Sequence, residues 1–215
     1  MTDGQVPAHV RAIAEQLDLG GPHSVYELGM SDGKLFKKYP TIWAFAGGCV
    51  LGSRAKAGTE SFRWVDVADL YQNVVKILPN GTTQYVIKFE LVDKRTIEVI
   101  GASTAAQTSR IKDFLPVASA FVTHCQLPAM RGKLDAGGEI VFGGPFLRSD
   151  GLFRPSIFGK GKLLPWAEIA GAGIDDGYVK VMARGAGKAW ASWSAALFPN
   201  ADAFIALIRE RAAGL

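Results

Sequence analysis

A short stretch of the chain recurs in weakened form about a hundred residues later, and this repeat limits the folds open to it. The first copy is FRWVDVADL at Phe62–Leu70, and the second is LPWAEIAGA at Leu164–Ala172. In both copies a tryptophan is followed by a small residue, an acid and an aliphatic residue. Trp64 and Trp166 lie 102 positions apart in a chain of 215 residues. Self-similarity at this spacing predicts a twofold internal repeat.

The first half of the chain reads as antiparallel strands followed by a helix. Short runs over residues 24–100 are separated by turn signals, which predicts a meander. Thr41–Leu51 is apolar throughout and is predicted to be one buried strand, whereas Gln84–Val92 alternates as a half-buried strand does. From Gln107 to Cys125 the apolar spacing becomes helical. Pro116 falls inside this run, so we expect a kink there or two abutting helices.

The second half repeats this plan in fewer residues. Short strands with intervening turns are predicted from Glu139 to Phe198, and a helix is predicted over Asn200–Ala212. Asn200 is a suitable N-cap, and Gly214 follows the last turn. The fold class is therefore α+β and mainly β, with two modules that each form a bent antiparallel sheet, or partly open barrel, capped by a C-terminal helix.

An amphipathic helix is predicted ahead of both modules, over Val6–Leu19. Val10, Ile13, Ala14 and Leu17 have the spacing of one helical face. A single short helix needs a surface for this face, so we expect it to pack on the first module, with binding to a partner as the alternative. The predicted division is an N-terminal helix and tail at 1–23, a first module at 24–136 and a second at 137–215.

Three segments resemble a known family. They are ESFRWVDVADLYQ at Glu60–Gln72, GKLLPWAEIAGAGIDDGYVKV at Gly161–Val181 and WASWSAALFPNADAFIALI at Trp190–Ile208. Together they resemble an uncharacterised bacterial family with two tandem pleckstrin-homology-like (PH-like) domains. The resemblance implies a fold for binding or scaffolding and no activity of its own, because one fold hosts many functions. Trp64 and Trp166 would then be structural landmarks, each packed against the helix of its module.

Composition narrows the classes of function. The net charge is +4, from 24 Lys and Arg against 20 Asp and Glu, and it is spread evenly. A nucleic-acid binder concentrates its basic residues on one face, so no nucleic-acid partner is predicted. Cys49 and Cys125 lack the spacing of a metal site and are expected to be reduced thiols. The first ten residues have no secretory features, and we expect a cytoplasmic protein.

No catalytic or cofactor-binding pattern stands out. Asp66, Asp69 and Glu168 lie in strands rather than in a recognisable cleft, and the three histidines have no nucleophile at motif spacing. Gly171 and Gly173 superficially suggest a dinucleotide loop, but such a loop must lead from a strand into a helix. We therefore predict no enzyme, no cofactor and no bound metal, while an enzyme with an unrecognised cleft stays the third hypothesis.

Two lysine clusters are the candidate ligand-binding residues: Lys34, Lys37 and Lys38 in the first half, and Lys160 and Lys162 in the second. Lysines on an early strand or loop of a PH-like domain suit acidic headgroups. The favoured interpretation is that they are ordinary solvated lysines at strand edges, where they resist pairing. The leading hypothesis is a binding module for a protein or peptide, and the alternative is attachment to an anionic membrane surface. A homo-oligomer is compatible with either.

Overall fold

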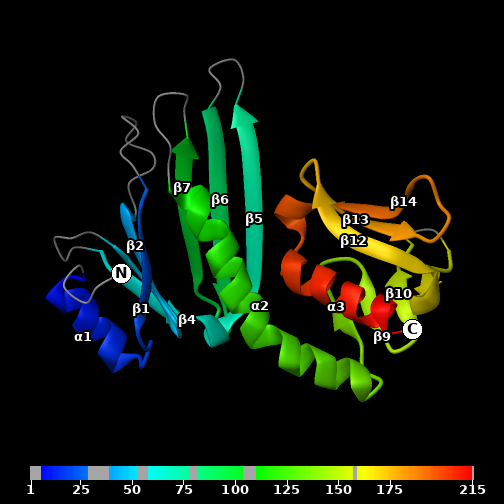
Figure 1. The fold of residues 1–215 in the computed structure, drawn as a ribbon, viewed down its shortest axis with the longest axis horizontal. Coiled ribbons are helices and arrows are strands. Elements are labelled where there is room, and N and C mark those ends of the chain that lie inside the picture. The colour runs from blue at the N-terminus through cyan, green and yellow to red at the C-terminus, as the bar shows by residue number, and fades with distance from the viewer. Residues whose placement is uncertain are drawn as a thin grey trace. The chain divides into compact units, whose positions relative to one another are not determined.

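Antiparallel sheets dominate the part of the chain that the structure describes, and three α-helices accompany them there (Figure 1). The computed structural model describes residues 6–28, 39–52, 58–77, 82–103, 110–156 and 159–214. Within them, four antiparallel sheets are present and a helix ends the chain. The predicted α+β, mainly β class is confirmed.

Two compact units divide the chain, Met1–Val122 (unit 1) and Thr123–Leu215 (unit 2). The division falls inside the long helix α2 (Ile111–Asp135), so this helix contributes its first half to one unit and its second half to the other. The boundary predicted at 136/137 separates the two sequence repeats, whereas these units are defined by packing. The boundary between the repeats therefore stays a prediction.

Both units have the same succession of elements. In unit 1 one sheet contains β1 (Pro22–Glu27), β2 (Thr41–Phe45), β3 (Gly48–Gly52) and β4 (Glu60–Arg63), and the other contains β5 (Val67–Ile77), β6 (Thr82–Leu91) and β7 (Thr96–Ser103). In unit 2 one sheet contains β8 (Ile140–Val141), β9 (Phe146–Arg148), β10 (Gly151–Arg154) and β11 (Lys162–Pro165), and the other contains β12 (Ile169–Asp175), β13 (Tyr178–Ala183) and β14 (Ala189–Ser194). A helix follows each set: α2 after β7, and α3 (Ala201–Ala213) after β14.

The repeated tryptophans occupy the same place in both units. Each begins a short 3-10 turn that joins the four-stranded sheet to the three-stranded one, at Trp64–Asp66 and at Trp166–Glu168. A bulge follows at equivalent positions, between Val67 and Asp69 and between Ile169 and Gly171. A bulge bends its strand and increases the local twist, which turns the chain from one sheet into the other. The repeat seen in the sequence therefore extends to backbone geometry.

The prediction of a single strand over Thr41–Leu51 is wrong. The structure has two strands, β2 and β3, joined by a tight turn at Ala46 and Gly47. Every residue of both strands is buried. Because both faces of the sheet are covered, the sequence shows no alternation that would mark where one strand ends and the next begins.

Of the two alternatives expected at Pro116, a kink or two abutting helices, the second is wrong. α2 is one helix of 25 residues that contains Pro116 in its second turn. Phe114, Ala118 and Val122 are buried along one side of this helix. Their packing outweighs the one backbone hydrogen bond that the proline removes.

The N-terminal helix packs on unit 1, as predicted. α1 (Ala8–Gln16) places Val10 and Ala14 in a separate apolar cluster with Trp43 and Val50 of the first sheet. In Figure 1 the helix lies beside β1 and β2. The main core of unit 1 lies on the other face of this sheet, where Ile42, Cys49 and Leu51 are fully buried. The first sheet is therefore covered on both faces.

Candidate functional site

Trp64 is a buried structural residue of unit 1. It has no exposed surface, and its Nε1 donates a hydrogen bond to the Phe45 carbonyl oxygen at 3.0 Å. Its ring stacks on Phe121 of α2, with ring centroids 5.5 Å apart and planes 2° from parallel. A second ring, that of Phe62, meets it edge-on at 5.5 Å. The indole thus joins the strand end to the helix and offers no face to a ligand.

Trp166 is the equivalent residue of unit 2, and it is 7% exposed. Its Nε1 donates to the Ser149 carbonyl oxygen at 2.9 Å. Its side chain belongs to the core that also contains Ile205 and Ile208 of α3. The small exposed part of the indole lies at the edge of a surface depression, which is the main candidate site in the described part of the chain.

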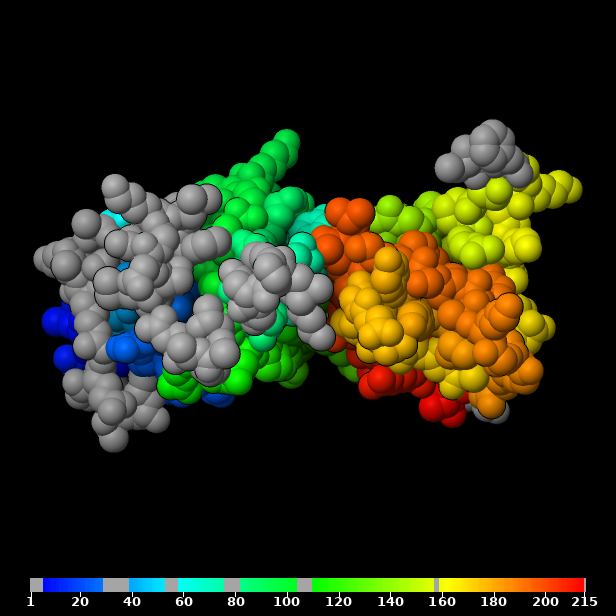
Figure 2. Space-filling view, turned by 90° about the horizontal axis from the view of Figure 1, so that it is seen from above, coloured from blue at the N-terminus to red at the C-terminus, as the bar shows by residue number. Residues whose placement is uncertain are grey.

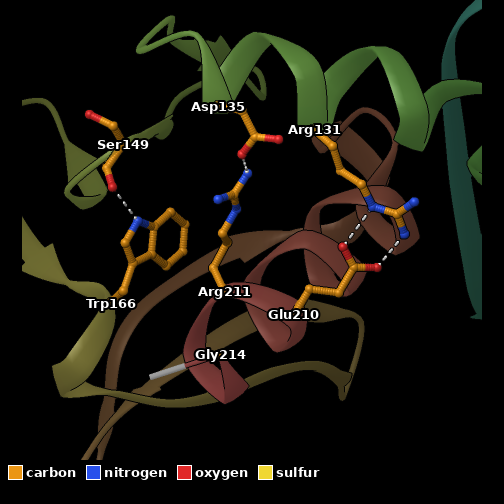
Figure 3. A pocket seen from close by; sticks show the side chains of 7 residues that line it. All are labelled: Arg131, Asp135, Ser149, Trp166, Glu210, Arg211 and Gly214. Atoms are coloured by element: carbon orange, nitrogen blue, oxygen red, sulfur yellow. Dashed lines mark hydrogen bonds and ion pairs between the residues drawn. The ribbon is translucent and has the colours of Figure 1, made fainter.

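This depression lies between α3 and the C-terminal half of α2, and its volume is about 450 Å³. Figure 3 shows the residues that line it: Arg131, Asp135, Ser149, Trp166, Glu210, Arg211 and Gly214. Two ion pairs cross it from helix to helix. Arg131 donates from Nε and Nη2 to the two carboxylate oxygens of Glu210, at 2.9 and 2.6 Å, and Arg211 donates to Asp135.

The charges of this depression neutralise one another. The hydrogen bonds from Arg131 lower the pKa of Glu210 below the ordinary value of a glutamate, although partial burial opposes this shift. The same contact raises the pKa of Arg131. A general acid at neutral pH needs a raised carboxyl pKa, and a phosphate site needs unpaired cations. These four side chains therefore form a clasp between helices and lack the features of a catalytic centre.

The other residues considered for catalysis or for binding a metal or cofactor are separated from one another. Asp66 is bound by Arg63 through two hydrogen bonds of 2.7 and 2.8 Å. Cys49 and Cys125 are free thiols, and burial raises the pKa of both. Gly171 and Gly173 lie in β12, which turns into β13 and not into a helix. Among the described residues, no three His, Cys, Asp or Glu side chains gather as a metal site.

The predicted lysine sites are only partly visible. Lys34, Lys37 and Lys38 lie outside the described residues. Lys160 and Lys162 are both exposed around the connection from β10 to β11. Neither forms an ion pair with a residue in the described ranges, in contrast to Lys88 and Lys180, which pair with Glu90 and Asp175.

The helix clasp was missed by sequence reasoning. Its signal is present: Arg131 and Asp135 stand four positions apart on one helical face, and Glu210 and Arg211 offer the opposite charges on a second helix. The partners lie 79 and 76 positions apart along the chain. Charges at helical spacing are common on exposed helix faces, so the pattern alone could not identify its partner.

Together these features define a class of protein: an α+β, mainly β chain of two similar units, each with a four-stranded sheet, a three-stranded sheet and a helix that follows them. Residues 35–214 match the model of a family of unknown function, DUF6585, and the chain belongs to this family. A search of the curated proteins and a search of the solved structures each found no match. No helix in the described ranges combines the length and the apolarity that a bilayer crossing requires.

Proposed function

We propose that the chain is a non-enzymatic cytosolic binding module of two PH-like units that recognises a protein or peptide. The repeated succession of a four-stranded sheet, a three-stranded sheet and a closing helix supports the PH-like assignment. The observation that carries the binding role is the outer edge of β12 in unit 2, which offers backbone groups for the addition of a strand.

The pairing register shows which groups face outward. β12 and β13 are joined by a two-residue turn between Asp175 and Tyr178. Residues that flank such a turn form a hydrogen-bonded pair, and these pairs recur at every second residue. Gly173 therefore bonds to β13, whereas Ala172 and Ile174 direct their N–H and C=O groups away from it. Arg209 of α3 donates to the Ala172 carbonyl oxygen at 3.2 Å, which agrees with this assignment.

The side chains along this edge leave room for an incoming backbone. A Cβ atom added at Gly171 or Gly173 would meet no atom within 4 Å. Ile174 is 45% exposed and Tyr178 is 49% exposed at the adjoining hairpin. The hairpin reaches the molecular surface in Figure 2. An extended peptide could therefore bond to the edge and place a side chain on Ile174.

Affinity purification of the tagged full-length chain, with Ile174→Pro and Ile174→Val beside it, tests the proposal. Proline removes an outward N–H without removing a bond to β13, whereas valine keeps this donor. We expect a partner that co-purifies with the wild type and with Ile174→Val and is lost from Ile174→Pro. A chain that recovers no partner, or one that all three recover equally, contradicts strand addition at β12.

A second candidate function is supported by Lys160 and Lys162, which are exposed and form no ion pair with a described residue. Lysines in this state can bind acidic lipid headgroups. Sedimentation with vesicles that contain phosphatidylserine, at low and at high salt, tests this function. Binding that is lost at high salt and in Lys160→Glu/Lys162→Glu would support it. Salt-independent binding, or none, would remove it.

A further inference from the structure

A row of four apolar side chains crosses the outer face of the first sheet of unit 2. Val141 pairs with Phe146, Phe146 pairs with Phe153, and Phe153 pairs with Leu163. Val141 is 59% exposed and Leu163 is 41% exposed, while both phenylalanines are half-buried. The alternate residues of these strands lie in the core of the unit: Ile140, Leu147, Leu152 and Leu164. We call the row Val141–Phe146–Phe153–Leu163 the outer row.

Unit 1 has an equivalent row, and the register shows it. Gly48 and Gly151 occupy matching positions, because a Cβ atom at either would lie 2.3 Å from the carbonyl oxygen of the neighbouring strand. Counting across the sheet from these glycines, Val50 matches Phe153, Trp43 matches Phe146 and Val25 matches Val141. The fourth position differs, because Ser61 stands where unit 2 has Leu163.

The two rows differ in what covers them. In unit 1, Trp43 is 1% exposed and Val50 is fully buried, because both pack against α1. The helix contributes Val10 and Ala14 to this contact. Unit 2 keeps a row of similar size but leaves its two ends exposed. The internal repeat thus shows what this face of the sheet accepts, which is the apolar stripe of a short amphipathic helix.

Charge around the outer row indicates the chemistry of the missing helix. Arg148 stands where unit 1 has Phe45, and its guanidinium lies 4.2 Å from the centre of the Phe153 ring. Glu139 pairs with Arg148 at 2.7 Å. Lys160 and Lys162 stand just before and at the start of the edge strand β11, both exposed, so cations outnumber acids near this end of the row, although Lys162 alternates to the face opposite Leu163. An occupant with acidic residues beside its apolar stripe would complement this end of the row.

We propose that the outer row of unit 2 is a docking surface for an amphipathic, acid-flanked helix of a partner protein, bound as α1 is bound to unit 1. This surface belongs to the first sheet of unit 2, whereas the β12 edge belongs to the second sheet, and it takes a helix instead of a strand. The inference therefore goes beyond the function proposed above, and either can fail alone.

A labelled peptide is the probe. It has the sequence of residues 6–19 with His9→Glu and Arg11→Glu, which keeps the apolar stripe and makes its flanks acidic. Fluorescence anisotropy measures its binding to the full-length chain. We expect saturable binding that weakens at high salt. Val141→Asp/Leu163→Asp should weaken it about tenfold or more, since two charges would face the apolar stripe.

The matched control is Val65→Asp/Val92→Asp, which places the same charges at valines of unit 1 that are 60% and 66% exposed. All four positions are exposed, so both double variants should fold, and circular dichroism verifies this. The control should bind the peptide like the wild type. A peptide with Val10→Asp, which breaks the stripe, should not bind.

Several results would overturn the inference. The peptide could fail to bind, or bind equally well to Val141→Asp/Leu163→Asp. If Ile174→Pro alone abolished binding, the β12 edge would be the site, and only the outer-row inference would fall. If the wild type formed a dimer or bound anionic vesicles, and only Val141→Asp/Leu163→Asp abolished this, the occupant would be a second copy or a membrane instead of a partner helix.

Discussion

Two glycines and two tryptophans hold equivalent places in the units at the scale of single residues. Gly48 and Gly151 let neighbouring strands approach so closely that no side chain fits between them. Trp64 and Trp166 each donate from Nε1 to a backbone carbonyl oxygen, that of Phe45 in β2 at 3.0 Å and that of Ser149 in the turn after β9 at 2.9 Å. The short sequence repeat around the two tryptophans therefore corresponds to a repeated set of contacts.

Substituting either close-packed glycine with alanine should destabilise the protein. The new Cβ atom would lie 2.3 Å from the Phe62 oxygen in Gly48→Ala, and from the Leu164 oxygen in Gly151→Ala. Overpacking against backbone cannot be relieved by a rotamer change, so we expect a loss of about 1–3 kcal/mol in the free energy of unfolding. Urea denaturation measures it. Gly173→Ala is the control, and its Cβ atom would meet nothing within 4 Å; an equal loss there would contradict the argument.

Trp64→Phe should lower the free energy of unfolding while keeping an aromatic ring on Phe121. The substitution removes the only donor of the indole, so the buried Phe45 oxygen loses this bond, at a cost of about 1–3 kcal/mol. Trp193→Phe is the control, because the Trp193 ring packs on Phe198 and Phe204 and its nitrogen bonds to no described residue. Equal stability of Trp64→Phe and the wild type, measured in urea, would show that the hydrogen bond contributes nothing.

At the scale of elements, helices close the sheets. α1 covers one face of the first sheet of unit 1, and α3 packs on β12 and supplies much of the core of unit 2. The C-terminal half of α2 is tied to α3 by the ion pairs Arg131–Glu210 and Arg211–Asp135. These contacts join elements with no proximity in the sequence.

The Arg131–Glu210 pair should stabilise unit 2 in a pH-dependent way. Because Arg131 lowers the pKa of Glu210 in the folded protein, the contribution is complete above the ordinary glutamate pKa of about 4.3 and is lost as the pH falls through the lower folded value. A double-mutant cycle with Arg131→Ala and Glu210→Ala measures the coupling. We expect a small positive coupling at about pH 7, since both side chains are exposed, and it should weaken progressively as the pH falls below about 4.3.

The Arg211–Asp135 pair is the internal control for this cycle. If removing Arg211 eliminated the coupling between Arg131 and Glu210, the four charges would act as one network. A coupling that showed no decrease at any pH below about 4.3 would contradict an electrostatic origin.

At the scale of the whole molecule, each unit has a core of its own. In unit 2, Phe204 is fully buried among Phe142, Trp193 and Phe198. In unit 1, Phe89 is fully buried beside Phe62 and Phe114. A chain with two cores can open locally in one unit while the other stays folded.

Phe204→Ala should therefore accelerate amide hydrogen exchange in β12–β14 and leave exchange in β5–β7 unchanged. Removing a buried phenylalanine ring costs about 3–5 kcal/mol, and that loss falls on the core that contained it. Phe89→Ala should produce the reverse pattern. Equal acceleration in both sets of strands for either variant would show that the two units unfold together.

Local features were predictable from the sequence because neighbouring residues encode them. The alternation in Gln84–Val92 corresponds to β6, and the helical spacing after Asn200 corresponds to α3. The reading failed where both faces of a strand are buried, as in Thr41–Leu51, since burial on both sides removes the period that distinguishes one strand from two. At Pro116 only the alternative of two abutting helices failed, because packing outweighs a local helix breaker.

By itself, the sequence determined the fold class, the repeat centred on Trp64 and Trp166, and the amphipathic helix at the N-terminus. All three rest on periods and motifs within a few residues. Only the tertiary structure decided that α1 covers the first sheet of unit 1, while the row Val141–Phe146–Phe153–Leu163 of unit 2 keeps its two ends exposed. The coverage of a face depends on which distant segment packs there, and no local pattern carries that information.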